Sequence, residues 1–215
     1  QMPATPEKPL PLVTNLVAAS AGRPADLLIP GESPQAQRLF TEARQRLREA
    51  ARAYSQLAEA RQATEQYPDD LWMAAEAFRR ARDYPATIRM LRGYLEHARP
   101  NQRQPEALVQ LGEVWLAEGN APAAVEALTQ VLDLHPRHPA KYAARLLLSQ
   151  AWLEQGEADK AAAQLQANLE GNDLTPASPE WQAALFALAR LKYGEQPWAG
   201  AGPRLLDVGS GPGIP

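Results

Sequence analysis

Breaks between helical stretches recur at a constant interval, and this regularity limits the possible folds more than any other feature of the chain. Three segments align without gaps around these breaks: ARDYPATIRML (81–91), AEGNAPAAVEAL (117–128) and EQGEADKAAAQL (154–165). Their matched positions Arg82, Gly119 and Gly156 lie 37 residues apart in both intervals. A fixed period of about 20 to 50 residues is typical of stacked supersecondary units. The chain is therefore predicted to be a linear array of repeats, and ALARLKYGEQ (187–196) begins a fourth unit.

The composition favours helices within these repeats. Hydrophobic residues make up 45% of the chain but aromatic residues only 7%, and alanine and leucine predominate. Alanine and leucine are good helix formers, whereas strands are enriched in β-branched and aromatic residues. The fold class is therefore predicted to be all-α.

An amphipathic segment precedes the repeats. Ser33 and Pro34 have the residue types preferred at an N-cap and at the first helical position. Apolar residues then follow at three- and four-residue steps up to about Gln66, and no proline or glycine interrupts them. This pattern predicts one long helix, or two helices separated by a tight break.

These observations divide the chain into four parts. The first contains six prolines, which remove backbone donors and disfavour helix, so an extended or disordered arm is expected there. The parts are a Pro-rich arm (1–33), a long helix or helix pair (34–67), repeats (68–196, with units at about 68–101, 105–138, 142–175 and a partial unit at 179–196) and a Gly/Pro-rich tail (197–215).

The best-defined unit is LVQLGEVWLAEGNAPAAVEALTQVLDLHP (108–136), in which small and large residues alternate in a way that suits two packed helices. Two helices approach closely only where one presents Gly or Ala, and a large side chain opposite then fills the space. Gly119 supplies the positive φ that ends the first helix. The unit resembles a tetratricopeptide repeat. The residues at the characteristic positions of that repeat are Leu111, Gly112, Trp115, Gly119, Ala124, Leu128 and Pro136.

The resemblance covers about half of the chain. It is good over 105–138, fair over 142–175 and weaker over 68–101. The chain departs from the family in its longer period, and also at Asn168 and Asp173, where the family has a small apolar residue and proline. The resemblance implies a right-handed α-solenoid of helix–turn–helix units.

The resemblance also implies a partner-binding groove, because in this family the first helix of each repeat lines a concave surface. A groove that clamps a terminal carboxylate would need Lys and Asn at these positions, and neither is present. The mixture of apolar and charged groups instead suits an amphipathic helix or an extended apolar segment with a polar edge. Alternatively, neighbouring helices or the chain's own N-terminal arm cover these side chains. The residues carried over are Asp69, Trp72, Glu76, Arg79, Arg80, Val109, Glu113, Leu116, Leu146, Gln150 and Leu153.

Other kinds of chemistry are not indicated by the sequence. The chain has no cysteine, and His135 and His138 fall in a predicted turn rather than at metal-ligand spacing. No catalytic pattern, cofactor site or membrane-spanning run is recognised. Residues 34–104 carry thirteen Lys and Arg against nine Asp and Glu, and residues 105–196 carry six against twelve. A solvated helix face explains the basic balance of the first half, and an acidic partner is favoured over nucleic acid if this half binds one.

One further motif lies near the end of the sequence. RLLDVGSGPGIP (204–215) resembles the first motif of S-adenosylmethionine-dependent methyltransferases, with Asp207, Gly209, Gly211 and Gly213 after an apolar pair. The helix, strands and acidic residue that complete the cofactor pocket in that family do not follow. Either the tail is rich in Gly and Pro by coincidence, or a longer protein continues into a catalytic domain.

The sequence therefore predicts a non-catalytic scaffold or adaptor that binds a protein or peptide segment in the concave groove. Two alternatives stay open. The chain is the recruiting region of a larger methyltransferase, or it is a structural subunit of an envelope assembly in which the repeats stack between chains. The compartment is not determined, because the chain begins with Gln rather than Met and an upstream signal or anchor is compatible with it.

Overall fold

The computed structural model describes residues 33–99, 103–170 and 173–194. This part of the chain is entirely helical and contains no strand. The all-α prediction is therefore confirmed. The helices are α2 (Pro34–Ala60), α3 (Tyr67–Arg80), α4 (Tyr84–His97), α5 (Gln104–Ala117), α6 (Ala121–Leu134), α7 (Ala140–Glu154), α8 (Ala158–Leu169) and α9 (Pro179–Tyr193).

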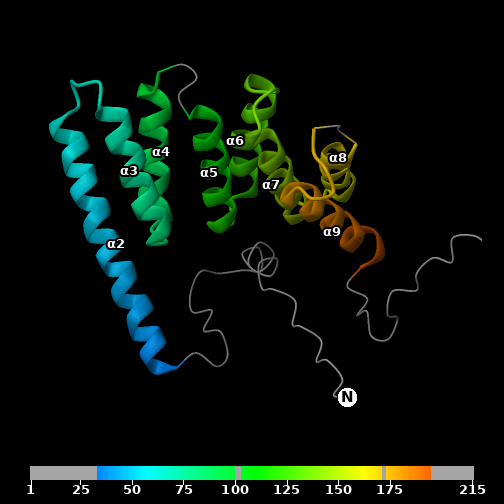
Figure 1. Ribbon diagram of the computed structural model, residues 1–215, viewed down its shortest axis with the longest axis horizontal. Coiled ribbons are helices and arrows are strands. Elements are labelled where there is room, and N and C mark those ends of the chain that lie inside the picture. The colour runs from blue at the N-terminus through cyan, green and yellow to red at the C-terminus, as the bar shows by residue number, and fades with distance from the viewer. Residues whose placement is uncertain (1–32, 100–102, 171–172, 195–215) are drawn as a thin grey trace, which may run out of the picture.

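The helices form a row in which each packs against the next (Figure 1). In addition, α5 contacts α7, and α7 contacts α9. Helices α3, α5, α7 and α9 are therefore the first helices of successive units and lie on one side of the row. Helices α4, α6 and α8 are the second helices of their units. This arrangement is the solenoid that the repeats predict.

The recurring breaks are short turns with a left-handed residue. Gly119 and Gly156 have φ of 75° and 78°, and Arg82 occupies the same place in the first unit with φ of 56°. Glycine adopts this conformation without a Cβ penalty, so it is the residue expected there. The next helix is then capped by Asp83 in α4 or Asn120 in α6, whose side chain accepts a hydrogen bond from a backbone amide of the first turn.

Small residues set the distance between helices in the core. Ala124 and Ala144 are fully buried, and they share one cluster with the large side chains of Leu128 and Leu148. Gly112 lies directly against the Leu128 side chain. The core is continuous along the row, because α5 contributes to the clusters on both of its sides.

The segment before the repeats is one helix rather than two. The C-terminal half of α2 packs on α3 through Ala51, Tyr54 and Ala58. The N-terminal half extends beyond the ends of α3 and α4 (Figure 1, blue). Leu39 and Phe40 lie on this half, and they are 60% and 54% exposed.

Candidate functional site

The groove expected from the sequence corresponds to the face lined by α3, α5 and α7. Three apolar side chains occupy equivalent positions on these helices, Trp72, Val109 and Leu146, and each is half-buried. The Trp72 ring packs against the buried Tyr94 ring, with centroids 5.4 Å apart, and the Arg103 guanidinium lies 5.6 Å from the Trp72 ring centroid. Trp72 therefore presents only part of its surface.

The charged residues of this face form one cluster between α3 and α5. The Glu76 carboxylate accepts hydrogen bonds from Arg79 Nη2 at 3.2 Å and from Gln110 Nε2 at 2.5 Å. Arg80 Nε lies 3.8 Å from Glu76 Oε2, and Arg79 Nη1 lies 3.7 Å from Glu113 Oε2. Each arginine thus has an acidic neighbour within the protein. The cluster therefore offers polar groups to a ligand without a strong net charge.

The third helix continues the face with mainly apolar residues. Leu153 is 42% exposed, and Gln150 donates a hydrogen bond to the Glu154 carboxylate at 3.4 Å. Leu146 packs against the cluster formed by Leu165, Ala184 and Leu188 of α8 and α9. The accessible apolar surface on α7 is therefore centred on Leu153.

One residue expected on the groove surface belongs to the core instead. Leu116 is only 7% exposed and packs in the cluster between α5, α6 and α7. Its equivalent positions, Arg79 and Leu153, are more accessible. The repeat register alone does not reveal this difference, because it depends on how closely α6 and α7 approach α5.

Other groups of this face have no counterpart in the residues carried over from the family. Gln110 links α3 to α5, and Arg103 and Tyr94 enclose Trp72. Burial raises the pKa of Tyr94, and the nearby Arg103 charge partly opposes this effect. Gln110 lies three residues before Glu113, and residues three apart share a helix face. This spacing was the sequence signal that could have placed Gln110 in the groove.

The departures at Asn168 and Asp173 both contact the beginning of α7. Asn168 is fully buried and donates a hydrogen bond to the Tyr142 carbonyl oxygen at 3.0 Å. Asp173 accepts hydrogen bonds from the Tyr142 hydroxyl at 2.7 Å and from Lys141 Nζ at 3.2 Å. These hydrogen bonds lower the pKa of Asp173, and the interactions of Lys141 with Tyr142 and then with Asp173 raise the pKa of Lys141. Asn168 and Asp173 therefore connect the end of α8 and the segment after it to the beginning of α7.

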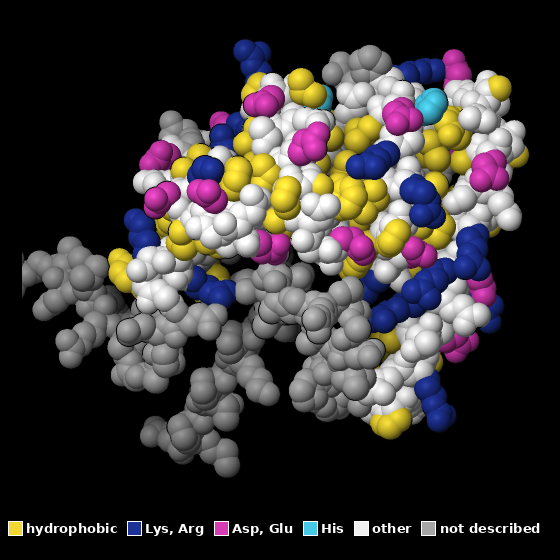
Figure 2. Space-filling model, turned by 180° about the vertical axis from the view of Figure 1, so that it is seen from behind, with side chains coloured by type: hydrophobic (Ala, Val, Ile, Leu, Met, Phe, Trp, Pro, Cys, Tyr) yellow, Lys and Arg dark blue, Asp and Glu magenta, His cyan; other side chains and the backbone are white. Residues whose placement is uncertain are grey.

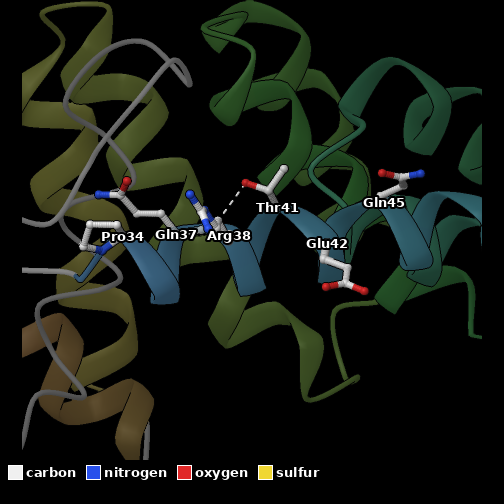
Figure 3. A pocket seen from close by; sticks show the side chains of 6 residues that line it. All are labelled: Pro34, Gln37, Arg38, Thr41, Glu42 and Gln45. Atoms are coloured by element: carbon white, nitrogen blue, oxygen red, sulfur yellow. Dashed lines mark hydrogen bonds between the residues drawn. The ribbon is translucent and has the colours of Figure 1, made fainter.

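Two surface hollows lie away from this face. One runs along α2, and the described side chains that line it all come from that helix (Figure 3). The other, of about 400 Å³, lies between α4 and α6 above α5, where the Arg92 guanidinium is 5.3 Å from the Trp115 ring centroid. Neither hollow brings together groups that suggest catalysis.

Within the described ranges, no group of His, Asp and Glu side chains has the arrangement of a metal site. No helix in that part of the chain has the length and apolar character needed to cross a bilayer. The Pro-rich arm and the segment 204–215, with its methyltransferase-like motif, lie outside the described residues.

Comparisons with known proteins agree with the repeat geometry. The tetratricopeptide repeat family model matches residues 72–139 and 116–179. The structure is similar to the crystal structure of a Podosopora anserina putative kinesin light chain with nearly identical TPR-like repeats. The TM-score is 0.56 at 19% sequence identity, over 76% of this chain and 88% of that chain. No curated protein sequence matches the chain. The family model and the helical array together place this chain in the tetratricopeptide repeat family.

Proposed function

We propose that the chain is a non-catalytic adaptor that binds a segment of another protein on the face lined by α3, α5 and α7. Tetratricopeptide repeats are generally protein–protein interaction modules, and helical arrays of this kind create extended concave binding surfaces. The observation that carries the proposal is the register of Trp72, Val109 and Leu146. Three successive first helices present a partly accessible apolar side chain at the same position.

The chemistry of this face suggests the kind of segment that it binds. Apolar side chains of the ligand would contact Trp72, Val109 and Leu153, and burial of apolar area contributes about 25 cal/mol per Å² before ordering costs. The cluster of Glu76, Glu113, Arg79 and Arg80 is electrically balanced, so it suits a polar edge rather than a highly charged peptide. An amphipathic helix or an extended apolar segment meets both requirements.

Capture experiments with matched variants test this proposal. The full chain is immobilised, and proteins retained from a lysate of its source are quantified by mass spectrometry. Leu153→Lys places a charge on the groove. Leu134→Lys makes the same change at the end of α6, where the leucine is 66% exposed. Trp72→Ala removes the largest groove side chain. Circular dichroism establishes that each variant remains folded.

The expected result is a protein that the wild type and Leu134→Lys retain but that Leu153→Lys and Trp72→Ala lose. Retention of the same proteins by all four chains would contradict the assignment of this face. A purified candidate would then be titrated against the same variants by calorimetry. A loss of affinity of about tenfold corresponds to about 1.4 kcal/mol and is expected for a buried lysine.

A further inference from the structure

The N-terminal half of α2 is a helix surface without a neighbour in the repeat array. Helix α2 has 27 residues, whereas α3, against which it packs, has 14. At a rise of about 1.5 Å per residue, α2 is about 40 Å long and α3 about 21 Å. Roughly half of α2 therefore extends beyond its partner helix, as Figure 1 shows.

The apolar stripe that joins α2 to α3 continues along this free half. Ala51 and Ala58 are buried against the repeats. Towards the N-terminus the stripe continues at three- and four-residue steps through Leu47, Ala43, Phe40 and Ala36. The rest of the surface of this half is polar, and five residues on it, Gln37, Arg38, Thr41, Glu42 and Gln45, are drawn in Figure 3. The free half is thus amphipathic, and Leu39 and Phe40 are its most exposed large apolar side chains.

We propose that this stripe binds the same stripe of a second copy of the chain, in an antiparallel helix pair centred on Ala43. Ala36, Leu39, Ala43, Leu47 and Ala50 lie along this side of the helix and are symmetric about Ala43, so the apolar pattern reads the same in both directions apart from Phe40. In an antiparallel pair, Leu39 lies opposite Leu47 of the partner subunit, and Ala36 lies opposite Ala50 of the partner subunit. The small Ala43 side chain at the centre lets the two backbones approach closely. Such a self-complementary surface is what a two-fold dimer requires.

The charges beside the stripe are complementary in this arrangement. Along one flank, Arg38, Glu42, Arg46 and Glu49 alternate in sign. An antiparallel two-fold pair places this flank against the same flank in reverse order. Arg38 then lies near Glu49 of the partner subunit, and Glu42 lies near Arg46 of the partner subunit. Within one chain Arg46 is already 4.0 Å from Glu42 and 3.7 Å from Glu49, so these groups form a shared network.

The other flank supplies a distinguishing feature. Arg44 lies on that flank, one residue from the centre, so in the dimer it meets Arg44 of the partner subunit. Like charges in close approach oppose association. Self-pairing about Ala43 therefore makes opposite predictions for two arginines on one exposed helix: Arg46 supports the dimer, whereas Arg44 weakens it.

The size of the surface limits the strength of the dimer. The contact from Ala36 to Ala50 spans about four helical turns. A single helix pair of this length buries less than the ~1,600 Å² of total area of a standard stable interface. We therefore expect a reversible equilibrium between monomer and dimer rather than a permanent dimer. The wild-type chain then sediments with a mass that increases with protein concentration.

Sedimentation velocity on the full chain, over a range of concentrations, tests the pairing. Leu39→Glu introduces an unpaired charge at the contact and is expected to weaken dimerisation about tenfold or more. Thr41→Glu adds the same charge on the polar side, where Thr41 bonds only the Gln37 carbonyl oxygen of its own helix, and leaves the equilibrium almost unchanged. Circular dichroism and the thermal midpoint are measured for both variants. Equal effects of the two substitutions would overturn the proposal.

The two arginines provide the second arm of the experiment. Arg46→Ala is expected to raise the dimer dissociation constant, and Arg44→Ala is expected to lower it. Changes in the same direction would overturn the antiparallel pairing about Ala43. A full chain that stays monomeric at every concentration, while a chain without residues 1–32 dimerises, would show that the N-terminal arm covers the stripe and would also overturn it. Neither arm depends on the groove of the repeats, so the outcome is independent of the proposed adaptor function.

Discussion

At the scale of single residues, Gly112 shows how one position sets the spacing of two helices. It lies within α5, and a Cβ atom added there would overlap with three atoms of the fully buried Leu128 side chain. Gly93 in α4 is different, because a Cβ atom there would lie 3.4 Å from its closest neighbour, Leu71 Cδ1, which is ordinary contact. Gly112 is therefore required by packing, whereas Gly93 occupies a helical position where alanine also fits.

We expect Gly112→Ala to destabilise the protein and Gly93→Ala to leave it unchanged or stabilise it. Alanine gains up to about 1 kcal/mol over glycine within a helix. Overpacking of a core costs about 1–3 kcal/mol, and at Gly112 this cost exceeds the gain. Urea unfolding gives the free energies of unfolding. Similar midpoints for the two variants would mean that α5 and α6 separate at little cost.

Asp173 provides a prediction about pH. Hydrogen bonds from Tyr142 and Lys141 lower the pKa of this exposed carboxyl. A lowered folded-state pKa stabilises the fold above the ordinary Asp value of about 3.9, and the contribution is lost as the pH falls through the folded-state value. Tyr142→Phe should raise the pKa of Asp173 in an NMR titration, while other carboxyl groups in the same spectra serve as controls. An unchanged pKa would mean that the Tyr142 hydroxyl does not bind Asp173 in solution.

Single residues differ in how far the sequence alone predicts them. The turns at Gly119 and Gly156 were predictable, because a helix often ends at a residue with positive φ and glycine favours that conformation. The role of Asn168 was not, because its partner is the Tyr142 carbonyl on another helix. The burial of Leu116 depends equally on how neighbouring helices approach. Local patterns therefore predict backbone conformation better than they predict long-range contacts.

At the scale of helices, α7 and α9 present the same position in two environments. Leu148 in α7 is 2% exposed, because it packs in the cluster that α7 forms with α5 and α6. Phe186 lies at the equivalent place eight residues before Gly194 and is 48% exposed. Helix α9 is the first helix of a unit, and no second helix covers it among the described residues. The larger aromatic side chain therefore contributes less burial than the smaller leucine.

Alanine at these two positions should therefore have unequal effects on stability. Leu148→Ala leaves a cavity in the core, and such changes cost about 2–5 kcal/mol. Phe186→Ala should cost less than Leu148→Ala, because the ring already contacts solvent over much of its surface. Thermal and urea unfolding of the two variants give the comparison. A larger loss for Phe186→Ala would show that its exposed side is covered in solution.

The helices themselves were largely predictable, and their packing environment was less so. The uninterrupted apolar steps of α2 and the absence of Pro and Gly indicated helix throughout, although they did not distinguish one helix from two. The structure has one helix because the chain turns only after Ala60. The protrusion of its first half follows from the lengths of α2 and α3 together, so no local signal could indicate it.

At the scale of the whole molecule, each helix contacts only near neighbours in the row. Helix α7 contacts α5, α6, α8 and α9. Helix α3 packs on α4, and α4 packs on α5, which connects the first unit to the later ones. In arrays of this kind, stability is approximately a sum of unit stabilities and nearest-neighbour interfaces. A destabilised unit should therefore affect adjacent helices more strongly than distant ones.

Hydrogen exchange on Leu148→Ala tests whether the array behaves in this way. We expect faster amide exchange in α7, α8 and α9, because the substitution weakens the contact of α7 with α5 and α6, which joins these three helices to the rest of the array. Exchange in α3 and the C-terminal half of α2 should remain close to wild type, because those helices pack in a separate cluster around Ala51 and Phe78. A uniform increase along the chain would show that the repeats open as one cooperative unit. Local opening at the α9 end would instead leave the first two helices of the groove, α3 and α5, in place, so a ligand held mainly by Trp72 and Val109 would bind Leu148→Ala almost as well as wild type.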